Sequence, residues 1–272
     1  MRKHILYPLL ALVLGGLGAA LRMWQLSHYE AGLPARGDPA SFALLALCAA
    51  AAVLFLVLAF RAKGFQAGAL FTQPSPVRAG LLLACAALLL LSAVLYLKAV
   101  MDALAIKAAV SSFLLELVLA ALSVPTVVSA AYLAKNARSG YPFSRNSLTV
   151  IFPVLYCWVW LIDAYRRHTA NPVLWDYVFL LLAVIALLLA AYGRSSFSFE
   201  DGKPRLTVFV SLAALFLAPI ALTGQREYGL PFLCAAVGMS LYALACLSGL
   251  LLNLPMPERP ESEIQTEVSS DE

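Results

Sequence analysis

One acidic residue, Glu116, lies inside a long apolar stretch of the chain. A charge at the centre of a transmembrane helix costs roughly 2.5 to 3.5 kcal/mol on insertion scales, so such a residue is a functional candidate by default. Ser112 and Ser123 follow helical spacing with Glu116, which puts the three on one polar face. The pattern predicts an acid that binds a cation, a cationic solute or a proton. The structural alternative is an interhelical hydrogen bond or an ion pair with one of three basic residues, Arg22, Lys98 or Arg167.

A second group of candidates combines aromatic rings with charge. Tyr156, Trp160, Asp163 and Arg167 fall at helical spacing, and the stripe that they form ends in charge. We take them, together with Arg22, as candidates for substrate binding or coupling. Two structural alternatives stay open: an aromatic belt at the membrane surface, and a simple pair between Asp163 and Arg167, which are four residues apart.

The sequence lacks the motifs of several other chemistries. The 5 cysteines are scattered without a CxxC pair, and the 3 histidines form no HExxH motif, so we expect no metal site. No Walker loop, Rossmann glycine fingerprint or nucleophile elbow is present, so we expect no cofactor and assign no catalytic residue. Basic residues do not gather in one patch, which disfavours nucleic-acid binding.

Composition places these residues in a membrane protein. The chain of 272 residues is 62% hydrophobic and 12% charged, with a mean hydropathy of +0.85, and its partner is therefore a lipid bilayer. The fold class that we predict is all-α, a polytopic membrane bundle of eight transmembrane helices, because every backbone amide in hydrocarbon needs an internal partner. Glu116 would lie about 12 Å from one end of its span, close to mid-membrane. The expected spans are 5–26, 39–60, 79–99, 108–133, 147–165, 172–192, 206–223 and 230–252.

Lysine and arginine counts predict the orientation. With the N-terminus inside, 12 of the 19 basic residues fall on the cytoplasmic side and 7 on the outer side. Basic loops are retained in the cytoplasm, so both termini are predicted to be cytoplasmic.

Three ordered pairs of markers predict an internal repeat. Pro8 and Arg22 are 14 residues apart, as are Pro153 and Arg167. In the second marker, Pro39 and Arg61 of the first half correspond to Pro172 and Arg194 of the second half, and each pair is 22 residues apart. In the third marker, Pro76 corresponds to Pro204. Four helices per half would place the two halves in the same direction across the membrane. The predicted organisation is a first four-helix repeat at 1–134, a cytoplasmic linker at 135–146, a second repeat at 147–253 and an acidic disordered tail at 254–272.

The repeat also predicts where a binding site would be. Its offset places Tyr156, Trp160, Asp163 and Arg167 opposite Ala11, Gly15, Gly18 and Arg22 in the first half. Either the bulky face of the fifth helix packs on the smooth face of the first, or the missing side chains leave a cavity. Any pocket should lie at this seam, open outward, with Glu116 at its floor.

The stretch from Asn171 to Phe199 resembles a segment of uncharacterised multi-pass membrane proteins of Gram-positive anaerobic bacteria. The resemblance covers the sixth span and the following loop, including Asn171-Pro172-Val-Leu-Trp175. It implies the plasma membrane of a bacterium, and it brings no activity or site residues.

Three function classes follow from the sequence. The first is small-solute transport or substrate capture in the membrane, with a small polar or cationic solute as partner. The second is a sensor or assembly protein whose acidic tail contacts a protein partner. The third is a lipid-modifying enzyme, in which Asp163, Glu116 and His168 would do acid-base work without a recognisable motif.

Overall fold

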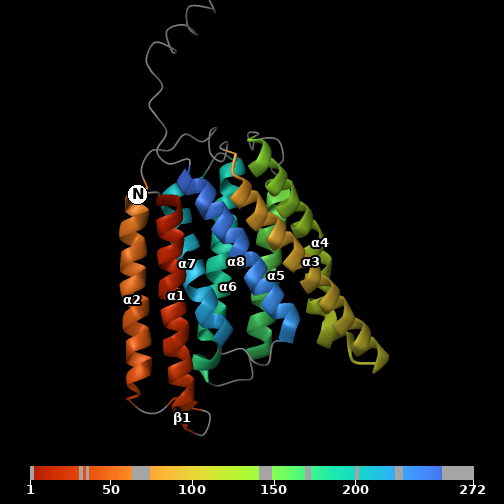
Figure 1. Ribbon diagram of the computed structural model, residues 1–272. Helices are drawn as coiled ribbons and strands as arrows, with labels where there is room; N and C mark the ends of the chain where they lie inside the picture. The colour runs from red at the N-terminus through yellow and green to blue at the C-terminus, as the bar shows by residue number, and fades with distance from the viewer. Residues whose placement is uncertain are drawn as a thin grey trace, which may run out of the picture.

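The computed structural model is a bundle of eight long helices, as the sequence predicts (Figure 1). It describes residues 3–30, 33–34, 37–62, 74–140, 149–168, 173–199, 202–223 and 229–252. All eight helices are long and apolar enough to cross a membrane. Their bounds are α1 Lys3–Ser27, α2 Pro39–Phe60, α3 Pro76–Ala105, α4 Val110–Ser139, α5 Phe152–His168, α6 Leu174–Ser196, α7 Pro204–Thr223 and α8 Gly229–Leu252.

Short elements flank the helices. The 3-10 turns η3 (Thr149–Ile151) and η4 (Phe197–Phe199) adjoin α5 and α6. Strands β1 (Tyr29–Glu30) and β2 (Leu33–Pro34) pair antiparallel after α1. We call the end of the bundle with these strands the hairpin end and the opposite end, where α1 begins, the N-terminal end (Figure 1).

Several helix termini follow directly from local sequence. Asp38 caps α2 by accepting hydrogen bonds from the amides of Ala40 and Ser41, and Pro39 begins the helix. Ser75 and Pro76 begin α3 in the same way. Gly140 ends α4 in the left-handed conformation at φ 69°, which costs a glycine little because it has no Cβ.

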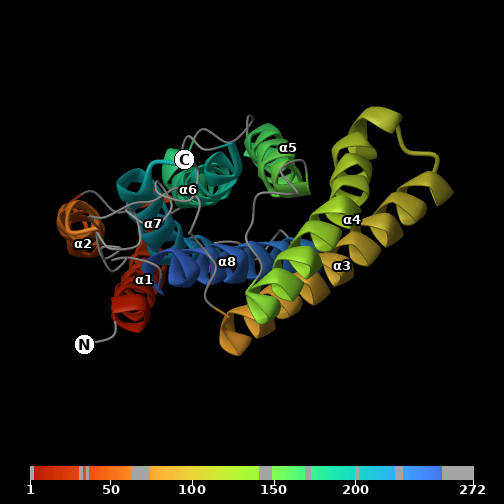
Figure 2. The same ribbon diagram turned by 90° about the horizontal axis from the view of Figure 1, so that it is seen from above.

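The helices of the first half flank those of the second half (Figure 2). Across the boundary between the halves, α1 and α2 pack mainly on α7, whereas α3 packs on α8 and α4 on α5. Accordingly, 61% of the residues in the apolar windows of α7 and α8 are buried, against 28% in α1 and α2. The two halves therefore make extensive contacts with each other besides those within each half. The predicted sequence repeat with its domain bounds stays a prediction.

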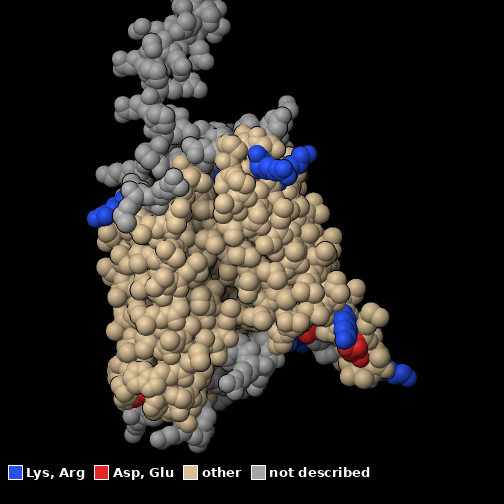
Figure 3. Space-filling model, in the orientation of Figure 1, with Lys and Arg blue, Asp and Glu red and all other residues tan. Residues whose placement is uncertain are grey.

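Charged side chains gather at the two ends of the bundle on the face that Figure 3 shows. The broad band between them presents other residue types. Large apolar side chains such as Val13, Val53 and Leu90 are more than half exposed. Such an exposed apolar band is expected where lipid is the solvent.

Candidate functional site

Three charged side chains meet at the hairpin end, where α5 ends and α4 begins. Arg167 Nη2 donates to Glu116 Oε1 over 2.8 Å, and Arg167 Nε donates to Asp163 Oδ2 over 2.9 Å. The Arg167 side chain is 39% exposed, Glu116 20% and Asp163 10%. We call Glu116, Asp163 and Arg167 the charged triad. Both predicted pairings of Arg167 are thus confirmed, and the structural alternative for Glu116 is an observed contact.

Glu116 lies closer to the end of its helix than we predicted. α4 contains 30 residues and begins at Val110, so Glu116 lies about 9 Å from one end of a helix about 45 Å long. The sequence window underestimated the helix because polar residues extend it to Ser139. Glu116 therefore lies near the hairpin end, where Arg167, one residue before the end of α5, can reach it.

Buried hydroxyl groups continue from the triad into the bundle. Tyr96 on α3 lies within electrostatic range of all three triad residues. The Tyr156 side chain is fully buried, and its hydroxyl makes no hydrogen bond of normal geometry, although Ser92 and Ser123 lie close to it. Both serine hydroxyls donate to backbone carbonyls, Ser92 to Pro231 over 2.8 Å and Ser123 to Leu119 over 2.8 Å. The oxygen lone pairs of the serines remain as polar neighbours of the phenol.

Trp160 has a packing role. It is 1% exposed, and its ring meets Phe232 of α8 edge to face with centroids 5.4 Å apart. The side chain of Ser112 lies outside the described residues. Among the candidates on α4 and α5, the structure therefore places Glu116, Asp163 and Arg167 in one cluster, with Tyr156 and Ser123 deeper in the bundle.

The predicted seam between the first and fifth helices is wrong. A Cβ built on Gly15 would lie 2.7 Å from the backbone oxygen of Phe216, and one on Gly18 would meet the side chain of Ile220. The small-residue face of α1 therefore packs on α7, because only small residues permit such close approach of two backbones. α5 packs instead on α4 and α6. A pocket at that seam with Glu116 at its floor is consequently not formed.

Arg22 belongs to a separate network at the hairpin end. It is 2% exposed and donates to the side chains of Gln25 and Tyr29 and to the carbonyl oxygen of Trp175. Its guanidinium carbon lies 5.6 Å from the centroid of the Phe179 ring. Arg22 thus ties α1 to α6, and it does not contact Glu116 as one alternative for that residue proposed.

The Arg22 network continues to the start of α2. Gln25 Nε2 donates to Ser41 Oγ over 2.7 Å, and Ser41 Oγ donates to Asp38 Oδ2 over 2.9 Å. Burial raises the pKa of Asp38, but the hydrogen bonds from the Ser41 hydroxyl and from the amides of Ala40 and Ser41 outweigh it and leave the pKa below its ordinary value. The network therefore favours an ionised Asp38.

Sequence reasoning missed a second group of buried basic residues, at the N-terminal end. Arg78 on α3 is 5% exposed and Arg194 on α6 is 3% exposed. They lie within electrostatic range of each other and of Cys246 on α8. Arg78 counted only toward the orientation, and Arg194 counted toward the orientation and the repeat. Nothing in the sequence pattern indicated that the helices would bury the two residues together.

The structure does not describe every predicted feature. The acidic tail at 254–272, and with it the proposed contact to a protein partner, lies outside the described residues, as does the second half of the 135–146 linker. Residues 135–139 of that linker belong to α4. Within the described part of the chain, no three His, Cys, Asp or Glu side chains cluster as metal ligands would.

Comparison with known proteins gives no family for this chain. No family model, no curated protein and no solved structure matches it. The resemblance of residues 171–199 to bacterial membrane proteins stays a prediction. Fold and composition together indicate a multi-pass membrane protein, with eight helices in the described residues that are able to span a bilayer.

Proposed function

We propose that this chain is a small-solute transport protein or a membrane-embedded substrate-capture subunit, and that the charged triad binds the solute or its coupling ion. The supporting observation is that two carboxylates, Glu116 and Asp163, share the single guanidinium of Arg167. These three side chains carry one net negative charge when all are ionised. A cationic solute or a proton would compensate that charge.

The geometry supports different roles for the two carboxylates in this proposal. Asp163 and Arg167 lie on the same helix at i and i+4, so their contact persists whatever α4 does. Glu116 comes from α4 and is the exchangeable partner. A bound ammonium group that replaces Arg167 at Glu116 would uncouple α4 from α5, which is the kind of interhelical change that alternating access requires.

Exposure supports access to the triad from one aqueous phase. Glu116 and Arg167 are partly exposed at the hairpin end, whereas the Tyr156 hydroxyl behind them is buried. A solute could therefore exchange the Glu116 contact at the surface and gain hydrogen bonds to phenols deeper in the bundle.

Ligand-induced stabilisation of purified protein tests the proposal. We expect one class among amino acids, polyamines, vitamins and nucleosides to raise the thermal midpoint of the wild type, because binding to the native state stabilises it. Glu116→Gln should abolish the shift. Asp102→Asn is the matched control, since Asp102 is an exposed acid on α3 at the same end of the bundle as Glu116. If no ligand stabilises the wild type and Glu116→Gln behaves identically, the proposal is wrong.

The proposed orientation has an independent test. We propose a bacterial plasma membrane location with both termini cytoplasmic, which the distribution of Lys and Arg supports. A green fluorescent protein fused after Glu272 should fluoresce, and a periplasm-dependent phosphatase at the same position should stay inactive. The opposite pair of results would reverse the orientation.

A further inference from the structure

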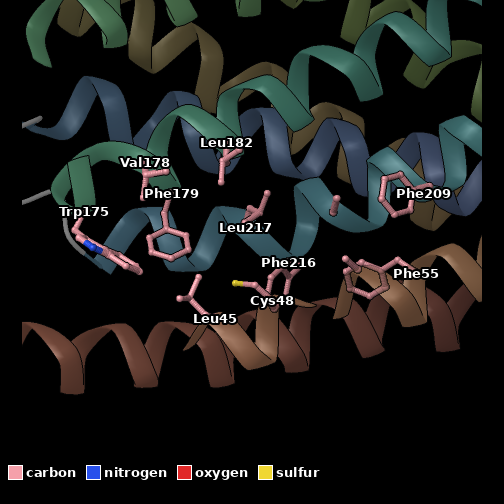
Figure 4. Close-up of a pocket in the computed structure, with 12 residues that line it drawn as sticks. Leu45, Cys48, Phe55, Trp175, Val178, Phe179, Leu182, Phe209, Phe216 and Leu217 are labelled. Atoms are coloured by element: carbon pink, nitrogen blue, oxygen red, sulfur yellow. The ribbon is translucent and has the colours of Figure 1, made fainter. Parts of the chain in front are cut away.

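A groove opens between α2 and α6, with α7 as its floor (Figure 4). Each of the three helices contributes four side chains to a cavity of about 270 Å³. Apart from the Cys48 thiol and the indole of Trp175, every lining side chain is a hydrocarbon. The groove lies apart from the charged triad, which none of these helices contributes to.

The groove is long and narrow. Its lining residues on α2 run from Leu45 to Phe55, a length of about 15 Å along the helix axis. α2 and α6 both pack on α7 without packing extensively on each other, and the cavity lies between them. The lining is apolar over this whole length, so the groove fits a flexible hydrocarbon chain. Because α2 is itself a candidate membrane span, a chain in the groove would lie parallel to the lipid tails.

Positive charge lies at the N-terminal end of the groove. Arg205 precedes the lining residue Phe209 by one turn of α7, and its guanidinium carbon lies 6.0 Å from the ring centroid of Phe60 on α2. Arg61 and Arg205 line a second cavity of about 570 Å³ with Val57 and Phe60. Both arginines are exposed, and neither forms an ion pair with a residue that the structure describes.

We propose that this groove binds one acyl chain of an anionic phospholipid, with the phosphate held by Arg61 and Arg205. Burial of the chain between α2 and α6 removes apolar surface of Leu45, Ala52 and Leu182 from contact with mobile lipid. The two guanidinium groups supply the charge complementarity, since arginine binds phosphate through paired donors. The order of the parts, an apolar groove followed by cations at a helix end, matches the order of tail and headgroup in a lipid.

Native mass spectrometry of delipidated protein tests the proposal. Phosphatidylglycerol and phosphatidylcholine of equal chain length are added back separately. We expect one tightly retained phosphatidylglycerol and weaker retention of phosphatidylcholine. The double variant Arg61→Gln/Arg205→Gln should lose the preference by roughly tenfold to thirtyfold, because each basic residue near an anionic headgroup contributes about a fivefold factor. Arg61→Lys/Arg205→Lys should retain most of it.

Matched variants separate the groove from general surface effects. Lys135→Gln/Arg138→Gln removes two exposed charges at the same end, on α4, and should leave the preference unchanged. Ala52→Trp fills the groove and should abolish retention of both lipids, whereas Val53→Trp, on the adjacent position that is 63% exposed, should not. Equal retention of the two lipids by wild type, or a preference that survives Arg61→Gln/Arg205→Gln in folded protein, would overturn the proposal.

Discussion

Arg167 on α5 reaches Glu116 on α4 across 51 positions of sequence, with 2.8 Å between Nη2 and Oε1. The same guanidinium also holds Asp163 one turn earlier on its own helix. Arg167 is thus held by Asp163 on its own helix while it contacts Glu116 on α4. Loss or exchange of Glu116 therefore removes the contact between α4 and α5, whereas the Asp163 contact stays within α5.

The Glu116–Arg167 contact should contribute little to folding. Arg167 is 39% exposed, and exposed ion pairs typically contribute about 0 to 1 kcal/mol. A double-mutant cycle of Glu116→Gln and Arg167→Gln, followed by unfolding in detergent, should give a coupling energy below about 1 kcal/mol. A coupling energy several times larger would mean that Glu116 acts mainly in stability, and its effect on ligand binding would then need a different explanation.

Tyr156→Phe should separate stability from ligand binding. The Tyr156 hydroxyl is buried without a hydrogen bond of normal geometry, so its removal should leave the free energy of unfolding unchanged or raise it by about 1 kcal/mol. If the hydroxyl serves the solute, the same variant should lose ligand-induced stabilisation. Tyr192→Phe, at a tyrosine that is 58% exposed, is the control and should change neither quantity. A marked loss of stability in Tyr156→Phe would show that the hydroxyl is needed for packing.

Gly15→Ala and Gly16→Ala should differ in sign although the glycines are adjacent. A Cβ on Gly15 would lie 2.7 Å from the Phe216 carbonyl oxygen, whereas one on Gly16 meets nothing within 4 Å. Gly15→Ala should therefore force α1 from α7 and destabilise by about 1 to 3 kcal/mol. Gly16→Ala should be neutral or stabilise by up to about 1 kcal/mol, since alanine favours a helix over glycine. Thermal unfolding of the two purified variants measures the difference, and equal midpoints would contradict the close packing of α1 on α7.

Asp38→Ala should lower the thermal midpoint at neutral pH, because it removes the cap of α2 and the acceptor for Ser41. Asp38→Asn should retain most of the cap. The pKa of Asp38 is lowered in the folded protein, so its ionised form stabilises the fold above the unfolded pKa of about 3.9. That contribution is lost as the pH falls through the lower folded pKa.

The pH dependence of the Asp38 effect is therefore a check on its cause. The difference in midpoint between wild type and Asp38→Ala should be largest at neutral pH and should shrink below a pH of about 4. A difference that grows on acidification would mean that the carboxylate is not the group that caps α2.

The amino-acid sequence by itself determined the eight spans and several helix termini. Long apolar runs must be helical in hydrocarbon, and residues such as Asp38, Ser75 and Gly140 act on their own helix ends. It also offered the Asp163–Arg167 pair as one of two structural alternatives, because residues four apart on one helix are neighbours whatever surrounds them, and the structure contains that pair.

Tertiary structure alone decided which helices meet. All helices are apolar on nearly every side, so their faces carry no strong signal for one partner over another. For this reason the face of α1 that contains Gly15 was expected to lie against α5, whereas it packs on α7. For the same reason three basic residues were possible partners of Glu116, and the structure shows Arg167 in contact with it. The groove between α2 and α6 depends on two helices that both pack on α7 without packing extensively on each other. No local pattern in the chain encodes that relation.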